Sequence, residues 1–140
     1  MPAHEDNLLL IVEDDPIYAE FIRSSIVQAR LPLNLRHVST LDEALAYLRG
    51  DAAYNDRAAH PMPAIILLDI LLGQARGFPV LTYLAENGLL DNEKISVILL
   101  TASERPEDLQ ESLHLGAISY LVKSPFASTI TSLVQKFCSP

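Results

Sequence analysis

The 140-residue sequence is poor in cysteine and in basic residues, and it contains no long hydrophobic run. Its single cysteine, Cys138, cannot form an internal disulfide, and its place near the end gives no indication of a redox role. Ten lysines and arginines stand against 18 aspartates and glutamates, a net charge of −8. Because nucleic-acid binding depends on clustered basic side chains, this composition argues against a nucleic-acid partner.

The apolar segment NLLLIV (7–12) is far too short to span a bilayer. It follows acidic residues rather than the basic residues that begin a secretory signal. We therefore expect a cytoplasmic protein without a membrane partner.

What the sequence does contain is typical of one globular domain. Its length is about that of a single domain, and 49% of its residues are hydrophobic against 20% charged. No internal repeat or low-complexity tract is present. We expect one domain over residues 1–140, with a core from about 7 to 138.

Short apolar runs alternate with segments of helical periodicity, which predicts an α/β fold. The predicted strands are LLLIV (8–12), NLRHVS (34–39, at an edge), AIILLD (64–69), ISVILLT (95–101) and SYLV (119–122). The predicted helices begin at Pro16 (apolar at Ile17, Phe21, Ile22 and Ile26) and at Thr40, and cover about 77–87, 105–116 and 125–137. Five strands alternating with five helices imply a doubly wound parallel sheet covered on both faces.

The polar residues of greatest chemical interest all follow predicted strands. Ligands of such sheets bind at the carboxyl ends of the strands, so these residues should share one edge. They are Glu13, Asp14 and Asp15 after the first strand, Asp69 after the third, Thr101 after the fourth and Lys123 after the fifth. The four histidines, His4, His37, His60 and His114, lack the spacing of a metal-binding pair, and we expect them away from this edge.

Carboxylates at the ends of neighbouring strands repel one another. Two charges about 4 Å apart repel by roughly 4 kcal/mol at an effective dielectric of about 20. Protonation or a cation relieves this repulsion, and oxygen ligands with room for water favour Mg²⁺. A carboxylate such as Asp69 beside Mg²⁺ can act as a nucleophile toward phosphorus, with Lys123 and Thr101 available to bind the phosphoryl oxygens.

Four motifs in order, LLLIVEDDP, IILLDILLGQARGFPVL, VILLTAS and GAISYLVKSPF, resemble those of response-regulator receiver domains. The resemblance covers essentially the whole chain. It implies a flavodoxin-like five-stranded parallel sheet of order 2-1-3-4-5 with five helices.

The resemblance also implies a role for each motif. Asp69 matches the acceptor of a phosphoryl group from the phosphohistidine of a sensor histidine kinase or phosphotransfer protein. Glu13 and Asp14 match the pair that holds Mg²⁺, with Asp14 closer to the metal and the main-chain carbonyl of Leu71 as a further ligand. Lys123 matches the lysine that binds the phosphoryl oxygens. Thr101 and Tyr120 match the switch pair, a hydroxyl and an aromatic residue that change position on phosphorylation. Gly77 matches the glycine of the loop before the third helix.

Two features depart from the family pattern. The family lysine is normally followed by proline, whereas Ser124 separates Lys123 from Pro125 here, which leaves the geometry of this loop open. The polar connection 50–63 is long, and such a loop is similar to that of receiver proteins that partner phytochrome-type sensor kinases.

The function implied is a stand-alone phosphorylation switch rather than an enzyme, with at most self-catalysed phosphotransfer and autodephosphorylation. Its output would act in trans through the face of the fourth helix, fifth strand and last helix, by binding a target protein, forming a homodimer or passing the phosphoryl group onward.

Three alternatives remain. An interaction module that works without phosphorylation would usually lack the acceptor or the acidic pair. A phosphohydrolase with an aspartate nucleophile would carry a second aspartate where Leu71 stands. A flavodoxin-like cofactor-binding protein would need a Ser/Thr/Gly-rich loop in place of EDDPIY (13–18).

Overall fold

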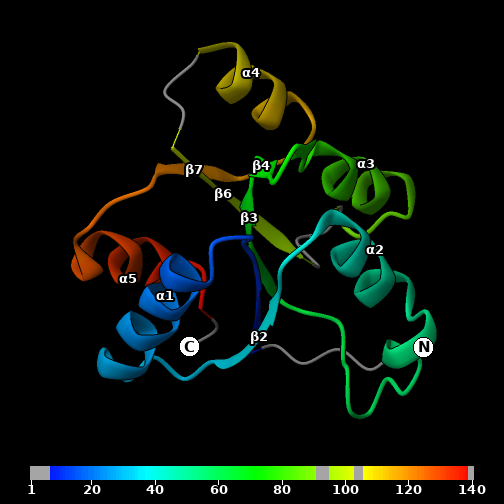
Figure 1. Ribbon diagram of the computed structural model, residues 1–140, viewed down its shortest axis with the longest axis horizontal. Coiled ribbons are helices and arrows are strands. Elements are labelled where there is room, and N and C mark those ends of the chain that lie inside the picture. Colours follow the sequence, from blue (N-terminus) through cyan, green and yellow to red (C-terminus); the bar gives the residue numbers. More distant parts are fainter. Residues whose placement is uncertain (1–6, 91–94, 103–105, 139–140) are drawn as a thin grey trace.

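A single parallel sheet forms the centre of the protein. The computed structural model describes residues 7–90, 95–102 and 106–138. The five strands of the sheet lie in the order β2-β1-β3-β6-β7 (Figure 1), which confirms the predicted order 2-1-3-4-5. They are β1 (Leu8–Val12), β2 (Asn34–Val38), β3 (Ile65–Asp69), β6 (Ser96–Thr101) and β7 (Ser119–Val122).

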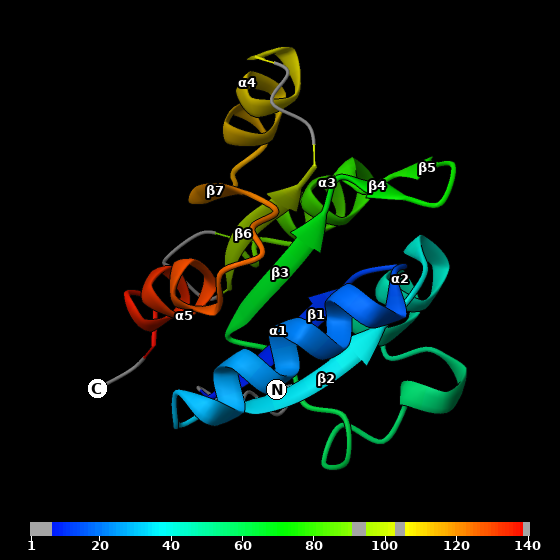
Figure 2. The ribbon, with the colours of Figure 1, turned by 60° about the vertical axis from the view of Figure 1, so that its left-hand side comes forward.

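Helices cover both faces of the sheet. Figure 2 shows α1 and α5 on one face and α2 and α3 on the other. The helices are α1 (Pro16–Gln28), α2 (Leu41–Arg49), α3 (Phe78–Glu86), α4 (Pro106–His114) and α5 (Ala127–Gln135), with a 3₁₀ turn η1 at Ala52–Tyr54. In the part of the chain that the structure describes, none of these helices has the length and apolar character needed to cross a membrane.

The two faces of the sheet bury two separate hydrophobic clusters, because neighbouring residues of a strand point to opposite faces. In β1, Leu8, Leu10 and Val12 join the cluster beneath α2 and α3, while Leu9 and Ile11 join the one beneath α1 and α5. All five residues of β1 and of β3 are buried. Both central strands are therefore apolar on both faces, as their sequences predict.

Local signals in the sequence set the helix starts. The Asp15 side chain accepts a hydrogen bond from the Ile17 N–H (3.0 Å), and Pro16 occupies the first turn of α1. Thr40 Oγ1 accepts from the Glu43 N–H (3.1 Å), so the predicted cap of α2 is confirmed.

Three details differ from the sequence predictions. Ile17 does not belong to the buried face of α1, because its side chain is 81% exposed. A short antiparallel hairpin, β4 (Leu71–Leu72) with β5 (Ala75–Arg76), follows β3. Helix α5 starts at Ala127 rather than at 125, because Ser124 Oγ accepts from the Phe126 N–H (3.0 Å) and holds Phe126 extended. Of the predicted helix 105–116, residue 105 lies outside the described residues.

The long connection 50–63 folds around one side chain, Arg57. Its guanidinium donates to the carbonyls of Tyr47 and Leu48 (2.7 Å each), which lie in the last turn of α2. It also donates to the His60 carbonyl (3.1 Å) farther along the connection. A cation at the carboxyl end of a helix satisfies carbonyls that have no partner within the helix.

Candidate functional site

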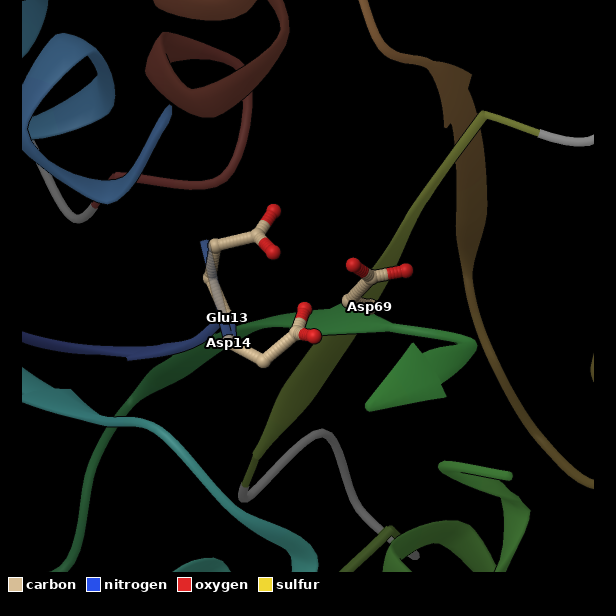
Figure 3. A group of neighbouring side chains, drawn as sticks. All are labelled: Glu13, Asp14 and Asp69. Atoms are coloured by element: carbon tan, nitrogen blue, oxygen red, sulfur yellow. The ribbon is translucent and has the colours of Figure 1, made fainter. Parts of the chain in front are cut away.

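The acidic residues predicted from the sequence meet at the carboxyl ends of β1 and β3. These strands are neighbours, with Val12 opposite Leu68, so Glu13 and Asp14 emerge beside Asp69. Figure 3 shows the three carboxylates turned toward a common space. Oxygen atoms of Glu13, Asp14 and Asp69 lie within 4.8 Å of one another. Glu13 (0% exposed) and Asp69 (3%) are buried, whereas Asp14 is exposed.

Lys123 brings a positive charge to the same place from the end of β7. Its Nζ lies 2.6 Å from Glu13 Oε1 and 3.0 Å from Asp69 Oδ2. Its side chain is 21% exposed, so the ammonium is largely withdrawn from solvent but still accessible. The predicted proximity of Lys123 to the acidic residues is confirmed despite the serine that follows it.

Backbone N–H groups orient the carboxylates. Asp69 Oδ1 accepts from the Leu71 N–H (3.1 Å), and Glu13 Oε2 accepts from the Asp15 N–H (3.1 Å). Asp14 Oδ2 accepts from the N–H of Gly73 (2.9 Å), which joins the end of β1 to the β4–β5 hairpin. The side chains are therefore held in place before any ligand binds.

Gly77 allows the hairpin to return close to Asp69. A Cβ atom at this position would overlap the main-chain oxygen of Asp69. The Gly77 N–H donates to the Ile70 carbonyl (2.5 Å), so the backbone segments are in direct contact. A glycine here is required by the close approach of the two segments.

Burial and the neighbouring charges shift the protonation of the site. Burial raises the pKa of Glu13 to about 7, although the contact with Lys123 works against this shift. Burial also works against the charge of Lys123, but its contacts with Glu13 and Asp69 outweigh burial and raise its pKa. For Asp14, burial works to raise the pKa, but hydrogen bonds to its carboxylate outweigh burial and lower the pKa. The largest of these contributions comes from the Gly73 N–H.

The donor set fits a hard divalent cation. Three carboxylates face a single ammonium in this part of the described structure, so their charges are not balanced once all three are ionised. Oxygen ligands, of which Asp14 remains open to water, are those that Mg²⁺ and similar ions prefer. Glu13, Asp14 and Asp69 could hold such an ion.

The remaining predicted residues are placed only in part. The backbone of Thr101 ends β6 opposite Val122, but its side chain lies outside the described residues. Tyr120, in β7, is partly buried and packs against the hydrophobic cluster beneath α2 and α3. The N–H of Leu71 contacts Asp69, while its carbonyl as a metal ligand stays a prediction.

One histidine does not lie where the sequence analysis expects it. His37 Nε2 lies 2.8 Å from the main-chain oxygen of Glu13, so the edge strand β2 contacts the acidic edge through this ring. His60 packs against Tyr47 and Tyr54 in the connection 50–63, away from the site as expected. His4 lies outside the described residues.

Sequence reasoning also missed Tyr18. Its hydroxyl contacts the backbone of Ser124, and its ring lies beside Lys123. A position in the first turn of α1, directly after the acidic residues, is the signal that could have indicated it, because this turn starts at the same edge of the sheet.

Comparisons with known proteins agree with this geometry. The family model of the response regulator receiver domain matches residues 9–135. Response regulator Rcp1 of Synechocystis sp. is 27% identical over 133 residues, which cover 95% of this chain and 87% of that protein. The transcriptional regulatory protein MalR of Bacillus subtilis is 33% identical over 122 residues, and the matched region spans 84% of this chain but only 44% of MalR.

Two solved structures show the same fold over nearly the full length. The phosphorylated cyanobacterial phytochrome response regulator RcpA has a TM-score of 0.78 and 28% identity, covering 96% of this chain and 91% of that chain. The Mn²⁺-bound form of Rcp1 has a TM-score of 0.77 and 27% identity, covering 93% and 90%. The resemblance of the four sequence motifs is thereby confirmed, and the chain belongs to the response regulator receiver domain family, the receiving component of two-component signalling.

Proposed function

We propose that this protein is a response regulator that accepts a phosphoryl group on Asp69 in a Mg²⁺-dependent reaction. The observation that carries the proposal is the meeting of Asp69 with Glu13, Asp14 and Lys123 at one edge of the sheet. The donor would be the phosphohistidine of a sensor histidine kinase or of a phosphotransfer protein. Because the phosphoryl group of such donors derives from ATP, we place the reaction in the cytoplasm.

The chain's own residues supply the acceptor and its electrostatic surroundings. An oxygen of Asp69 forms a bond to phosphorus while the bond from phosphorus to the donor nitrogen breaks. The electron pair of that bond stays with the imidazole, and the product is an aspartyl phosphate. Lys123, already 3.0 Å from Asp69 Oδ2, neutralises charge on the transferred group.

Glu13, Asp14, Asp69 and the main-chain carbonyl of Leu71 would hold Mg²⁺, with Asp14 closer to the ion than Glu13. When bound, the ion offsets the charge that builds up on the phosphoryl oxygens. The solved Mn²⁺-bound form of Rcp1 supports a divalent cation in this family.

The proposed output is a change of surface around β7. A phosphoryl group adds charge next to Lys123 and Thr101, and movement of Thr101 would leave room for Tyr120 to turn inward. A downstream protein or a second copy of the chain would bind the face of α4, β7 and α5 in one state only. The likeness to RcpA, a phytochrome response regulator, supports a phytochrome-type kinase as the partner.

Incubation with acetyl phosphate and Mg²⁺ tests the phosphorylation directly. We expect intact-mass spectrometry to show one added phosphoryl group, and we expect EDTA to abolish the addition until excess Mg²⁺ is restored. Equal addition with and without the chelator would contradict metal dependence. No addition under any condition would instead favour an interaction module that works without phosphorylation.

The pKa of Glu13 predicts how Mg²⁺ affinity depends on pH. Its pKa is raised from 4.5 to about 7, so the metal-free folded protein keeps a proton that the unfolded chain loses. This proton stabilises the fold at low pH, and the contribution is lost as pH rises through about 7. A cation must displace the same proton, so Mg²⁺ affinity should rise about tenfold per pH unit below the pKa and level off above it.

Calorimetric titration with Mg²⁺ in buffers of different ionisation enthalpy measures both the affinity and the protons released. Glu13→Gln, which cannot ionise, is the matched control and should release no proton from this site. Identical affinities on the two sides of the pKa of Glu13 in the parent protein would refute this account.

A further inference from the structure

A side chain from the other end of the chain helps to hold the connection between β7 and α5. Tyr18, in the first turn of α1, donates its hydroxyl hydrogen to the Ser124 carbonyl (2.9 Å) and accepts from the Ser124 N–H (2.9 Å). The two residues are 106 positions apart. One hydroxyl therefore satisfies both backbone polar groups of the residue that follows Lys123.

The ring of Tyr18 lies beside the ammonium group at the end of the Lys123 side chain. Lys123 Nζ lies 5.0 Å from the centroid of this ring, within the range of a cation–π interaction. The same Nζ contacts Glu13 and Asp69. The ammonium thus lies between two carboxylates and an aromatic face, while the backbone that carries it is fixed by the hydroxyl of that same aromatic residue.

Serine at position 124 makes such a fixing group necessary. A proline directly after Lys123 would have no N–H and a restricted φ, whereas serine has an N–H that needs a partner and a freer backbone. Tyr18 provides the partner. The Ser124 side chain fixes the backbone that follows, since its Oγ accepts a hydrogen bond from the Phe126 N–H (3.0 Å).

The packing of α1 against α5 does not depend on this hydroxyl. The two helices meet through a buried cluster to which α1 contributes Ile22 and Ile26 and α5 contributes Ile130 and Val134. Tyr18 packs against the edge of this cluster as a partly buried residue, and its ring lies against Phe21. Loss of the hydroxyl alone should leave the helix pair in place.

We propose that Tyr18 is a positioning residue that holds Lys123 aimed at Asp69 before the phosphoryl group arrives. The proposal rests on the proposed function, in which Lys123 binds the phosphoryl oxygens. Its hydroxyl acts through the backbone at Ser124, and its ring acts on the ammonium itself. Tyr18 does not contact the reacting atoms.

The test is a double-mutant cycle with Tyr18→Phe and Lys123→Met. Phenylalanine keeps the ring and removes both hydrogen bonds to Ser124. We expect phosphorylation by acetyl phosphate to slow about tenfold in Tyr18→Phe, because misplacing a group around the transferring phosphoryl costs up to about a hundredfold. In the Lys123→Met background the same substitution should have no further effect, since the two residues act as one unit.

Tyr83→Phe is the matched control, because it removes an equivalent hydroxyl from α3 on the opposite face of the sheet. Its phosphorylation rate should equal that of the parent. Mg²⁺ affinity should be unchanged in Tyr18→Phe, since the hydroxyl does not contact the carboxylates. Equal slowing by Tyr18→Phe with and without Lys123, or a loss of Mg²⁺ affinity that matches the slowing, would overturn the proposal.

A second measurement needs no phosphorylation. The NMR signal of the Lys123 ε-carbon reports the surroundings of its ammonium, and in Tyr18→Phe it should move toward the signal of the exposed Lys136. An unmoved signal would overturn the positioning role even if the parent accepts no phosphoryl group. A parent that is not phosphorylated but shows the shift would refute the proposed function and leave the contact itself supported.

Discussion

We expect Asp69→Asn to leave the protein without any phosphoryl group after incubation with acetyl phosphate and Mg²⁺. The substitution keeps the size of the side chain and its acceptor toward the Leu71 N–H, but it removes the charge and one carboxylate oxygen. A neutral amide is a poor nucleophile toward phosphorus, so we expect a loss of at least about a thousandfold, beyond the usual effect of removing one stabilising contact.

Intact-mass spectrometry measures this outcome, with Asp15→Asn as the matched control. Asp15 is next to the acidic pair in the sequence, but its side chain caps α1 at the Ile17 N–H, a role that asparagine also fills. The control should be phosphorylated like the parent. Phosphorylation of Asp69→Asn at the parental rate would show that another residue is the acceptor.

Much of the site could be predicted from sequence because its residues follow strands. The apolar run 65–68 is buried on both faces, which identifies β3 as central and places Asp69 at its carboxyl end. The same reasoning places Glu13 and Asp14 beyond β1, and the parallel register of β1 with β3 brings them together. Strand burial follows from local sequence patterns. The strand order that makes β1 and β3 neighbours is instead what the resemblance of the four motifs to receiver domains implies.

Contacts between distant segments could not be predicted in this way. The hydroxyl of Tyr18 reaches Ser124 only because α1 and α5 pack on the same face of the sheet. Arg57 orders the connection 50–63 through backbone carbonyls, and carbonyls carry no sequence signal. The ring of His37, on β2, likewise contacts a backbone atom, the main-chain oxygen of Glu13 at the end of the neighbouring strand β1. Side-chain contacts to a remote backbone depend on geometry that periodicity does not encode.

The start of α5 shows how a local interaction can also mislead. Apolar periodicity from 125 onward favours an early helix, yet Ser124 Oγ captures the Phe126 N–H and delays the first turn. Serine competes for backbone donors in this way at turns and caps. The delay leaves residues 123–126 as a connection of their own, and this connection carries the lysine of the site.

The charges of the site have to be considered together with its burial. Glu13 is fully buried, and Lys123 supplies its compensating charge, while the Asp15 N–H donates to its other carboxylate oxygen. Asp69 shares the same ammonium and is almost as deeply buried. Without metal, one lysine therefore supports two buried carboxylates. Removing it has consequences for stability as well as for phosphorylation.

Lys123→Met is expected to slow phosphorylation about a hundredfold, the usual effect of losing one preorganised charged contact to the reacting group. It should also lower the free energy of unfolding of the metal-free protein by about 3 kcal/mol near pH 8, because breaking a buried ion pair leaves its partner uncompensated. At about pH 5.5 the loss should be smaller, since Glu13, with its pKa raised to about 7, then carries a proton and needs no counter-charge.

Urea unfolding in EDTA at the two pH values separates this electrostatic cost from simple loss of packing. Lys136→Met, at the exposed end of α5, removes the same charge without a buried partner and should change the unfolding free energy by less than about 0.5 kcal/mol. Adding Asp69→Asn to Lys123→Met should restore part of the stability near pH 8, because one uncompensated carboxylate is then removed. An equal loss at both pH values, with no recovery in the double variant, would show that Lys123 stabilises the fold through its hydrocarbon chain rather than through its charge.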